Sequence, residues 1–315
     1  MPKHGHSERL DDAARAAWLY YVAQNTQDEI AEKLGISRQS AQRLVALATQ
    51  ERLVKFRLDH PIARCLALAE RLKDRYGLDF CEVTPADPSS DDPALGIAEV
   101  TAAEMERALS VESPIVMALG TGREIKGAVE QMPPMNCPHH KVVSLVGTLA
   151  PDGSASFNDV IMRMGDATQA PHYPMAVPVV AFSHEERDVL CAQVPIQRNI
   201  TLAQCADITF VGIGELDDEP PLLTDGFITQ KELDDLIAAG GAGEIVGWAY
   251  DDQGALISGE TNDRVASVPL DQPAERPIIG VARGPKKLRA IRGALAGRWI
   301  TGLITDETTA EALAG

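Results

Sequence analysis

Seven short apolar segments recur between residues 80 and 304, and patterns typical of helices lie between several of them. The candidate strands are Cys81–Val83, Ile115–Leu119, Val142–Val146, Val177–Ala181, Ile208–Ile213, Ile278–Val281 and Ile300–Ile304. The candidate helices are Ile97–Leu109, Glu124–Gln131, Gln230–Ala239, Lys286–Leu295 and Thr308–Leu313. Apolar strands that alternate with helices predict an α/β domain, with a mostly parallel, Rossmann-like sheet and helices on both faces.

Sheets of this kind bind ligands at the carboxyl ends of their strands. Four segments near predicted strand ends combine glycines with polar side chains: Gly120-Thr121-Gly122-Arg123-Glu124, Val211-Gly212-Ile213-Gly214-Glu215, Gly243-Glu244-Ile245-Val246-Gly247 and Arg283-Gly284-Pro285-Lys286-Lys287. Glycines let backbone amides approach a ligand, and a helix start attracts anions or hydroxyl oxygens. The alternatives are tight strand-to-helix turns around Gly120 and a solvated helix charge at Lys287.

Residues 13–53 show a different pattern, which predicts three helices. The first runs from about Ala13 to Ala23, with an apolar stripe of Ala14, Trp18, Leu19 and Val22. Thr26 and Glu29 form a capping-box pattern before the second helix, which runs to Leu34, and Ser37 caps a third helix that runs to about Thr49. Gly35 suits the tight turn between them. The predicted core is Ile30, Ala31, Leu34, Ile36, Ala41 and Leu44.

This arrangement predicts a helix-turn-helix whose third helix enters the major groove of operator DNA. The candidate DNA-binding residues are Ser37, Arg38, Gln39, Ser40, Gln42 and Arg43, because Arg and Gln pair with base edges and Ser reaches phosphates. The alternative is a three-helix cap with a solvated polar face. Residues 51–58 alternate apolar and basic side chains, as in a short wing or the exit from the domain.

The charge distribution permits a nucleic-acid partner although the net charge is −17. Residues 1–58 hold nine Lys or Arg and seven Asp or Glu, so the rest of the chain carries the acidic excess. Phosphate attraction acts locally, within about 10 Å, so a small basic face on an acidic body can bind DNA.

The remaining composition favours a cytoplasmic protein without a cofactor. The five cysteines are scattered and form no CxxC pair, as in a reducing compartment. No apolar run is long enough to span a bilayer, and the polar N-terminus lacks a signal-peptide core. We expect no metal at His139, His140 and His172, because adjacent histidines point in different directions and no fitting ligand spacing accompanies them.

The chain resembles the SorC family of sugar-sensing transcriptional regulators over almost its whole length. The segments that carry the resemblance are TQDEIAEKLGISRQSAQRLV, ALGTGREIKGAV, ADITFVGIGE, GAGEIVGWAYDDQG and ARGPKKLRAIRGAL followed by LITDETTAEAL. The resemblance implies a C-terminal domain related to sugar-phosphate isomerase folds but used for binding, and dimers or tetramers. It places the effector near Gly120, Thr121, Gly122, Arg123, Ser156, Asn158, Glu244 and Lys287. Within the family, the chain looks most like regulators of sorbitol, mannitol or erythritol catabolism.

One position departs from the family pattern. Many relatives carry a hydroxyl residue where this chain has Glu124, beside the presumed phosphate loop. A carboxylate about 4 Å from a phosphate costs a few kcal/mol at intermediate dielectric, whereas it accepts hydrogen bonds from hydroxyls. We therefore expect an unphosphorylated sugar or polyol as the effector.

The sequence thus predicts three parts: a helix-turn-helix domain over 1–58, a linker helix over 59–79 that contacts a second subunit, and an effector-binding domain over 80–315. The apolar side of the linker helix consists of Leu66, Leu68, Ala69, Leu72 and Tyr76. The leading interpretation is an effector-controlled transcriptional regulator and not an enzyme. The alternatives are a sugar-phosphate isomerase with an accessory helical domain, and a DNA-binding protein whose C-terminal domain only oligomerises.

Overall fold

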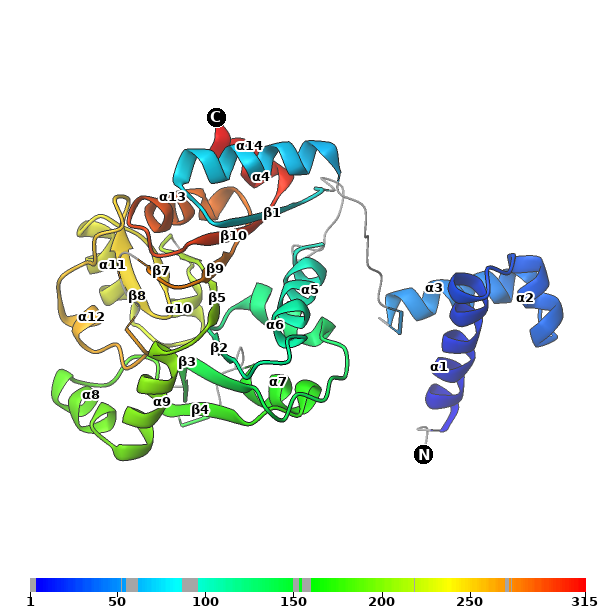
Figure 1. Ribbon diagram of the computed structural model, residues 1–315, viewed down its shortest axis with the longest axis horizontal. Coiled ribbons are helices and arrows are strands. Elements are labelled where there is room, and N and C mark those ends of the chain that lie inside the picture. Colours follow the sequence, from blue (N-terminus) through cyan, green and yellow to red (C-terminus); the bar gives the residue numbers. More distant parts are fainter. Residues whose placement is uncertain are drawn as a thin grey trace. The chain divides into compact units, whose positions relative to one another are not determined.

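The structure, a computed structural model, describes residues 4–51, 53–54, 62–86, 96–149, 153–154, 160–217, 219–269, 272 and 274–315. The chain divides into two compact units, Met1–Asp59 and His60–Gly315. Only helices occur in the described part of the first unit, whereas the second is α/β (Figure 1). Within the described residues, no helix is both long and apolar enough to span a membrane.

Local sequence signals set the helix boundaries in the first unit. Its elements are α1 (His4–Ala17), a π-helical turn η1 (Trp18–Val22), α2 (Gln27–Leu34) and α3 (Arg38–Gln50). Thr26 and Glu29 form the predicted capping box, and Ser37 caps α3 by accepting a hydrogen bond from the Ser40 amide. Gly35 ends α2 with φ 65°, a conformation that favours glycine. The predicted helix-turn-helix is confirmed.

The core of this unit matches the prediction in α2 and α3 but not in α1. Ile30, Ala31 and Ala41 are buried, with Leu34, Ile36 and Leu44 packed against them. The predicted stripe on the first helix is confirmed only at Leu19, which packs against this core; Trp18 is 57% exposed and Val22 is 64% exposed. The buried face consists instead of Ala13, Ala16 and Ala17. Small side chains allow α1 and α3 to approach closely, so these alanines face inward, whereas Trp18 and Val22 face solvent.

The second unit is built on a seven-stranded sheet in its described residues. The strands are β1 (Phe80–Thr84), β2 (Val116–Leu119), β3 (Lys141–Leu149), β4 (His172–Pro178), β5 (Ile208–Gly212), β9 (Ile278–Val281) and β10 (Gly302–Asp306). Their order is β1-β10-β9-β5-β2-β3-β4, and every neighbouring pair is parallel. The predicted α/β class is confirmed. The fourth strand begins earlier than predicted, at His172 rather than Val177.

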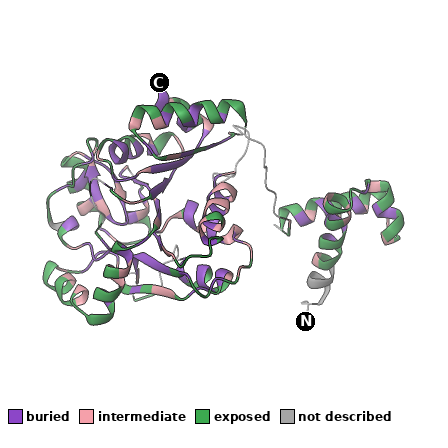
Figure 2. Ribbon diagram, viewed as in Figure 1, coloured by how far each residue is buried: buried purple, intermediate pink, exposed green. Residues whose placement is uncertain are grey.

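Helices cover both faces of this sheet, so its strands are buried on both sides (Figure 2). One core is shared with α5 (Ile97–Leu109), α6 (Arg123–Gln131) and α7 (Ile161–Thr168). The opposite core is shared with α4 (Ala63–Tyr76), α9 (Val194–Gln204), α13 (Leu288–Ala296) and α14 (Glu307–Ala314). Strand side chains alternate between the two: Met117 and Leu119 enter the first core and Ala118 enters the second.

A small antiparallel sheet lies beyond the end of β5. It contains β6 (Gly214–Glu215), β7 (Gly241–Ile245) and β8 (Trp248–Asp251), in the order β6-β7-β8. Only Ile213 separates β5 from β6, so this sheet is fixed at the carboxyl edge of the large one. The remaining elements are α8 (His184–Cys191), α10 (Pro221–Thr224), α11 (Gln230–Ala238), α12 (Glu260–Asp263) and η2 (Pro285–Lys287).

Helix α4, in the region predicted as a linker helix, packs within the second unit. Leu68, Ala69 and Leu72 are buried, and Tyr76 packs against the same core. Leu66 was expected on this apolar side but is 52% exposed, because the side that faces β1 and α14 excludes it. Most of the predicted wing over 51–58 lies outside the described residues.

Candidate functional site

Residues from separate segments converge at the carboxyl edge of the parallel sheet, around a cavity of about 260 Å³ that we call the edge cavity. Its lining contains Thr121, Gly122, Arg123, Glu124, Val146, Val179, Gly212, Ile213, Gly214, Glu219, Pro221, Leu222, Thr224, Asp225, Phe227, Glu244, Gly247 and Lys287. These residues come from the ends of β2, β3, β4 and β5, from the small sheet, from the segment around α10 and from η2. The chain thus brings together most of the side chains that the sequence predicted for an effector site.

A buried ion pair lies at the centre of this group. Lys287 Nζ donates a hydrogen bond to Glu124 Oε1 at 3.0 Å. Lys287 is 7% exposed and Glu124 is 8% exposed, so the solvated-charge alternative for Lys287 is excluded. Glu124 lies in the first turn of α6, and Lys287 ends η2. A buried pair of this kind is strongly destabilised when one partner is removed.

Glu215 is the acidic neighbour that the sequence analysis did not single out. Its Oε2 atom lies 4.0 Å from Lys287 Nζ, and its Oε1 atom lies 4.0 Å from Arg123 Nη2. Oε2 is buried and accepts no hydrogen bond from any described residue. The signal was present in Val211–Glu215, but only the structure shows that this carboxylate lies near Lys287.

Glu244 is held by the hairpin turn that follows β7. Gly247 donates its backbone N–H to Glu244 Oε2 at 2.7 Å. Val246 has φ 50° and Gly247 has φ 91°, so both central residues of the turn are left-handed. A β-branched residue rarely adopts this conformation, and such strain is concentrated at functional sites. Here the strained turn aims an amide at the carboxylate.

The environment of Glu244 favours its protonated form. Burial raises the pKa of the Glu244 carboxyl to about 6, the Glu215 carboxylate adds to the rise, and the Gly247 amide and the Lys287 ammonium oppose it. The side chain still lines the edge cavity, where a ligand can reach it. At pH 7 the Glu244 carboxyl is still mostly ionised and accepts hydrogen bonds, and it takes up a proton as the pH falls through about 6.

Two glycines allow the close approach of these segments. A Cβ atom on Gly212 would lie 2.6 Å from the backbone oxygen of Thr121, so only glycine lets the loop after β2 pass β5 at this distance. A Cβ atom on Gly214 would overlap the carboxyl group of Glu244. Gly120 does not line the edge cavity; it packs beneath it, against Val211 and Val246.

The other predicted residues fall into two groups. Thr121, Gly122 and Arg123 line the edge cavity with Glu124, Glu244 and Lys287. Ser156 and Asn158 lie outside the described residues. The structure adds residues 219–227, from the segment around α10, which carry no regular pattern that the sequence analysis could recognise.

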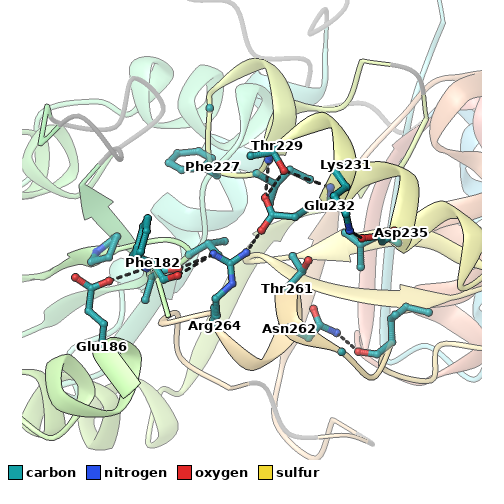
Figure 3. Close-up of a pocket in the computed structure, with 18 of the residues that line it drawn as sticks. Phe182, Glu186, Phe227, Thr229, Lys231, Glu232, Asp235, Thr261, Asn262 and Arg264 are labelled. Atoms are coloured by element: carbon teal, nitrogen blue, oxygen red, sulfur yellow. Dashed lines mark hydrogen bonds and ion pairs between the residues drawn. The ribbon is translucent and has the colours of Figure 1, made fainter. Parts of the chain in front are cut away.

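A larger cavity, of about 1020 Å³, opens beside the edge cavity and shares Phe227 with it. It holds none of the predicted effector residues, and its charged groups have partners within the chain. Figure 3 shows Arg264 directed at Glu232, and Glu186 accepting a hydrogen bond from the Phe182 amide. Because the edge cavity carries the buried carboxylates and the ammonium, it is the better candidate for recognising a polar ligand.

The predicted DNA-reading residues lie at the start of α3. Gln39, Gln42 and Arg43 are exposed along the helix. Arg38 is also exposed, and its Nε lies 3.5 Å from Asp28 Oδ1 of α2. Ser37 is occupied as the N-cap, and its hydroxyl lies 2.9 Å from that of Ser40. Gln39, Gln42 and Arg43 therefore form the part of this helix best placed to reach base edges.

Both ring nitrogens of His140 are used in hydrogen bonds to the backbone. His140 is fully buried, and its Nδ1 accepts a hydrogen bond from the Ile115 amide at 3.1 Å. Its Nε2 must then carry the proton and donate to the Leu109 carbonyl at 3.0 Å. No cluster of potential metal ligands occurs among the described residues.

A helix-turn-helix unit joined to an α/β domain with a polar cavity at its strand ends is the architecture of a ligand-controlled transcriptional regulator. Residues 60–314 match the family model described as "Putative sugar-binding domain". The chain belongs to this sugar-binding family of SorC-type transcriptional regulators.

Full-length relatives agree with this assignment. The erythritol catabolism regulatory protein EryD of Brucella abortus (strain 2308) is 35% identical over 303 residues, which are 96% of each chain. The deoxyribonucleoside regulator of Bacillus subtilis (strain 168) is 28% identical over 311 residues, which are 97% of this chain and 98% of the relative. The crystal structure of the sorbitol operon regulator SorC from Klebsiella pneumoniae shares the fold, with a TM-score of 0.70 and 24% identity over 98% of this chain and 100% of that chain.

Proposed function

We propose that the protein binds operator DNA of a polyol catabolic operon through α3, and that a small unphosphorylated polyol in the edge cavity changes this binding. The observation that carries the effector proposal is the buried Glu124–Lys287 pair, with Glu244 and Glu215 beside it. Carboxylates accept hydrogen bonds from hydroxyl groups, and an ammonium donates to hydroxyl oxygens. A polyol presents both kinds of partner on every carbon atom.

The charge balance of the edge cavity favours a neutral ligand over a phosphate. Its lining holds the acids Glu124, Glu219, Asp225 and Glu244 against the bases Arg123 and Lys287, and Lys287 already pairs with Glu124. A phosphate would add further negative charge in a partly desolvated site. The volume of the edge cavity, about 260 Å³, lies just below the range of about 300–1,000 Å³ of ordinary ligand pockets. This size suits a ligand of a few carbon atoms.

The regulatory mechanism that we propose is a population shift between two arrangements of the protein. A ligand can shift such an equilibrium only by binding one arrangement more tightly than the other. Helix-turn-helix proteins usually read two half-sites as dimers, so we expect the protein to act as a dimer or tetramer. The relatives are named as regulators, and we propose that the edge cavity binds its ligand without turnover.

The test is thermal unfolding of the full-length protein with erythritol, sorbitol, mannitol and the phosphates of these polyols. A ligand at about 100 times its dissociation constant adds roughly 2.7 kcal/mol to the free energy of unfolding. We expect at least one neutral polyol to raise the transition temperature and its phosphate to leave it unchanged. A shift with the phosphates alone would show that the interpretation of Glu124 is wrong.

A further inference from the structure

Lys287 has two carboxylate partners at unequal distances. Its ammonium is 3.0 Å from Glu124 Oε1 and 4.0 Å from Glu215 Oε2. Glu215 Oε2 is buried and accepts no hydrogen bond within the described part of the chain. A movement of about 1 Å toward Glu215 would thus bring the ammonium within hydrogen-bonding distance of this second carboxylate. A ligand hydroxyl that hydrogen-bonds to Glu124 would compete with Lys287 for this carboxylate and favour the exchange of Lys287 to Glu215.

The backbone before Lys287 is tied to the start of α14. Gly284 donates its N–H to Thr309 Oγ1 at 2.8 Å, and Thr309 is 2% exposed. Arg283 Nη1 lies 3.5 Å from Asp306 Oδ2, and Asp306 Oδ1 accepts a hydrogen bond from the Thr309 amide at 2.8 Å. The segment 283–287 and the first turn of α14 are therefore constrained to move together.

Helix α14 is in turn held by α4 at both of its ends. At its start, Arg64 Nε lies 2.9 Å from Glu307 Oε1. At its end, the Tyr76 hydroxyl donates to the Leu313 carbonyl at 3.0 Å, and Arg75 and Arg71 donate to the Ala314 carbonyl at 2.9 Å and 3.1 Å. Helix α4 is the first helix of the second unit, after the connection from the DNA-binding unit.

From these contacts we infer that the exchange of Lys287 between Glu124 and Glu215 is the switch, and that α14 and α4 relay it toward the DNA-binding unit. This inference rests on the proposed function, because the ligand that drives the exchange is the polyol in the edge cavity. A relay needs a two-state element that both sites bias. The Lys287 ammonium is that element, and Thr309 couples it to α14.

The test separates ligand binding from the response to the ligand. In the full-length protein, erythritol is the probe, and the operator is a DNA selected by the protein from a random pool. The measurements are the calorimetric dissociation constant for erythritol, and operator affinity with and without saturating erythritol. Thr309→Val removes the hydroxyl that accepts from Gly284. Thr309→Ser keeps it, and Thr308→Val changes the exposed neighbour.

We expect erythritol to change the operator affinity of the parent by roughly tenfold, within the usual range of allosteric coupling. Thr309→Val should bind erythritol within about threefold of the parent and lose most of this response, while Thr309→Ser and Thr308→Val retain it. The double variant Tyr76→Phe/Arg75→Gln removes two of the contacts at the end of α14 and should weaken the response, whereas Asp74→Asn on the same helix should not. If Thr309→Val does not fold, the double variant still tests whether α14 and α4 transmit the response to erythritol. Glu215→Gln should weaken the change in operator affinity measured at saturating erythritol. At saturation, a lower affinity for erythritol does not by itself alter this response.

Parent-like responses in Thr309→Val and in the double variant, with erythritol still bound, would overturn the relay and leave the proposed function intact. If neither erythritol nor any other polyol bound the parent protein, the proposed function itself would be wrong, and the switch would fall with it.

Discussion

Lys287 Nζ lies 3.0 Å from Glu124 Oε1, although 163 residues separate them in the sequence. The parallel sheet explains the meeting, because every βα connection starts at the same edge. Glu124 stands just after β2, and Lys287 stands just after β9. With Glu215 and Glu244 nearby, this one ammonium is close to three carboxylates.

Removal of the Lys287 charge should therefore destabilise the protein strongly. Lys287→Met leaves Glu124 and Glu215 buried without their shared cation, and such a change costs about 3–5 kcal/mol. Lys286→Met is the matched control, because the side chain of Lys286 is 75% exposed and exposed substitutions usually stay within about 0.5 kcal/mol. Urea denaturation at pH 7 measures both. Equal stabilities of the two variants would contradict the role of the buried pair.

The double variant Lys287→Met/Glu124→Gln refines this test. Neutralising Glu124 as well removes one of the two uncompensated charges, so the double variant should be more stable than Lys287→Met alone. A loss equal to the sum of the two single losses would show that the residues do not interact.

Much of the fold follows from local signals in the sequence. The caps at Thr26 and Ser37 and the turn at Gly35 act within one helical turn, so the sequence alone locates α2 and α3. The stripe predicted over residues 13–23 failed at Trp18 and Val22 because periodicity alone does not say how closely two helices approach. Close packing on α3 selected the small residues Ala13 and Ala16 over Trp18.

The candidate site was only partly predictable for a related reason. Thr121, Glu124 and Lys287 follow parallel strands, so the edge where they meet follows from the α/β class alone. The segment Gly243–Gly247 predicts Glu244 as a site residue, but the position of Glu215 close to it depends on the antiparallel pairing of β6 with β7, which connects segments of weak strand character. No local pattern in residues 219–227 indicates that they close the edge cavity.

The buried carboxyl of Glu244 should give stability a distinctive pH dependence. Its pKa is raised from 4.5 to about 6, so the folded protein holds this proton more tightly than the unfolded chain. The contribution to folding is complete below pH 4.5 and is lost as the pH rises through about 6. The shift corresponds to about 2 kcal/mol.

Glu244→Gln isolates this contribution, because Gln has the same shape and does not titrate. The free energy of unfolding of the parent, minus that of the variant, should fall by about 2 kcal/mol between about pH 3 and pH 7. Glu219→Gln, at an exposed position of the same cavity, is the control for the loss of a carboxylate from the lining. A constant difference for Glu244→Gln would mean that its carboxyl is not perturbed.

The exposed face of α3 makes a prediction about sequence-specific DNA binding. Gln39→Ala should weaken binding to a selected operator by about 1–3 kcal/mol and relax the preference at one base pair, if its amide reads a base edge. Gln50→Ala removes the same group from the far end of the helix and should leave affinity unchanged. Fluorescence anisotropy with cognate and scrambled DNA measures both effects. Equal affinity of the parent for the two DNAs would argue against base recognition by α3.

Substitutions at His139 and His140 test whether these histidines have a structural role or bind a metal. His140 is fully buried and satisfies both the Ile115 amide and the Leu109 carbonyl, so His140→Ala removes two hydrogen bonds and leaves a cavity. The expected loss is about 2–5 kcal/mol. His139 is exposed, and its Nε2 lies 3.4 Å from the Val111 carbonyl, so His139→Ala should cost less than about 1 kcal/mol. Urea denaturation with and without EDTA measures these losses. A metal shared by the pair would instead make both variants equally unstable and the parent sensitive to the chelator.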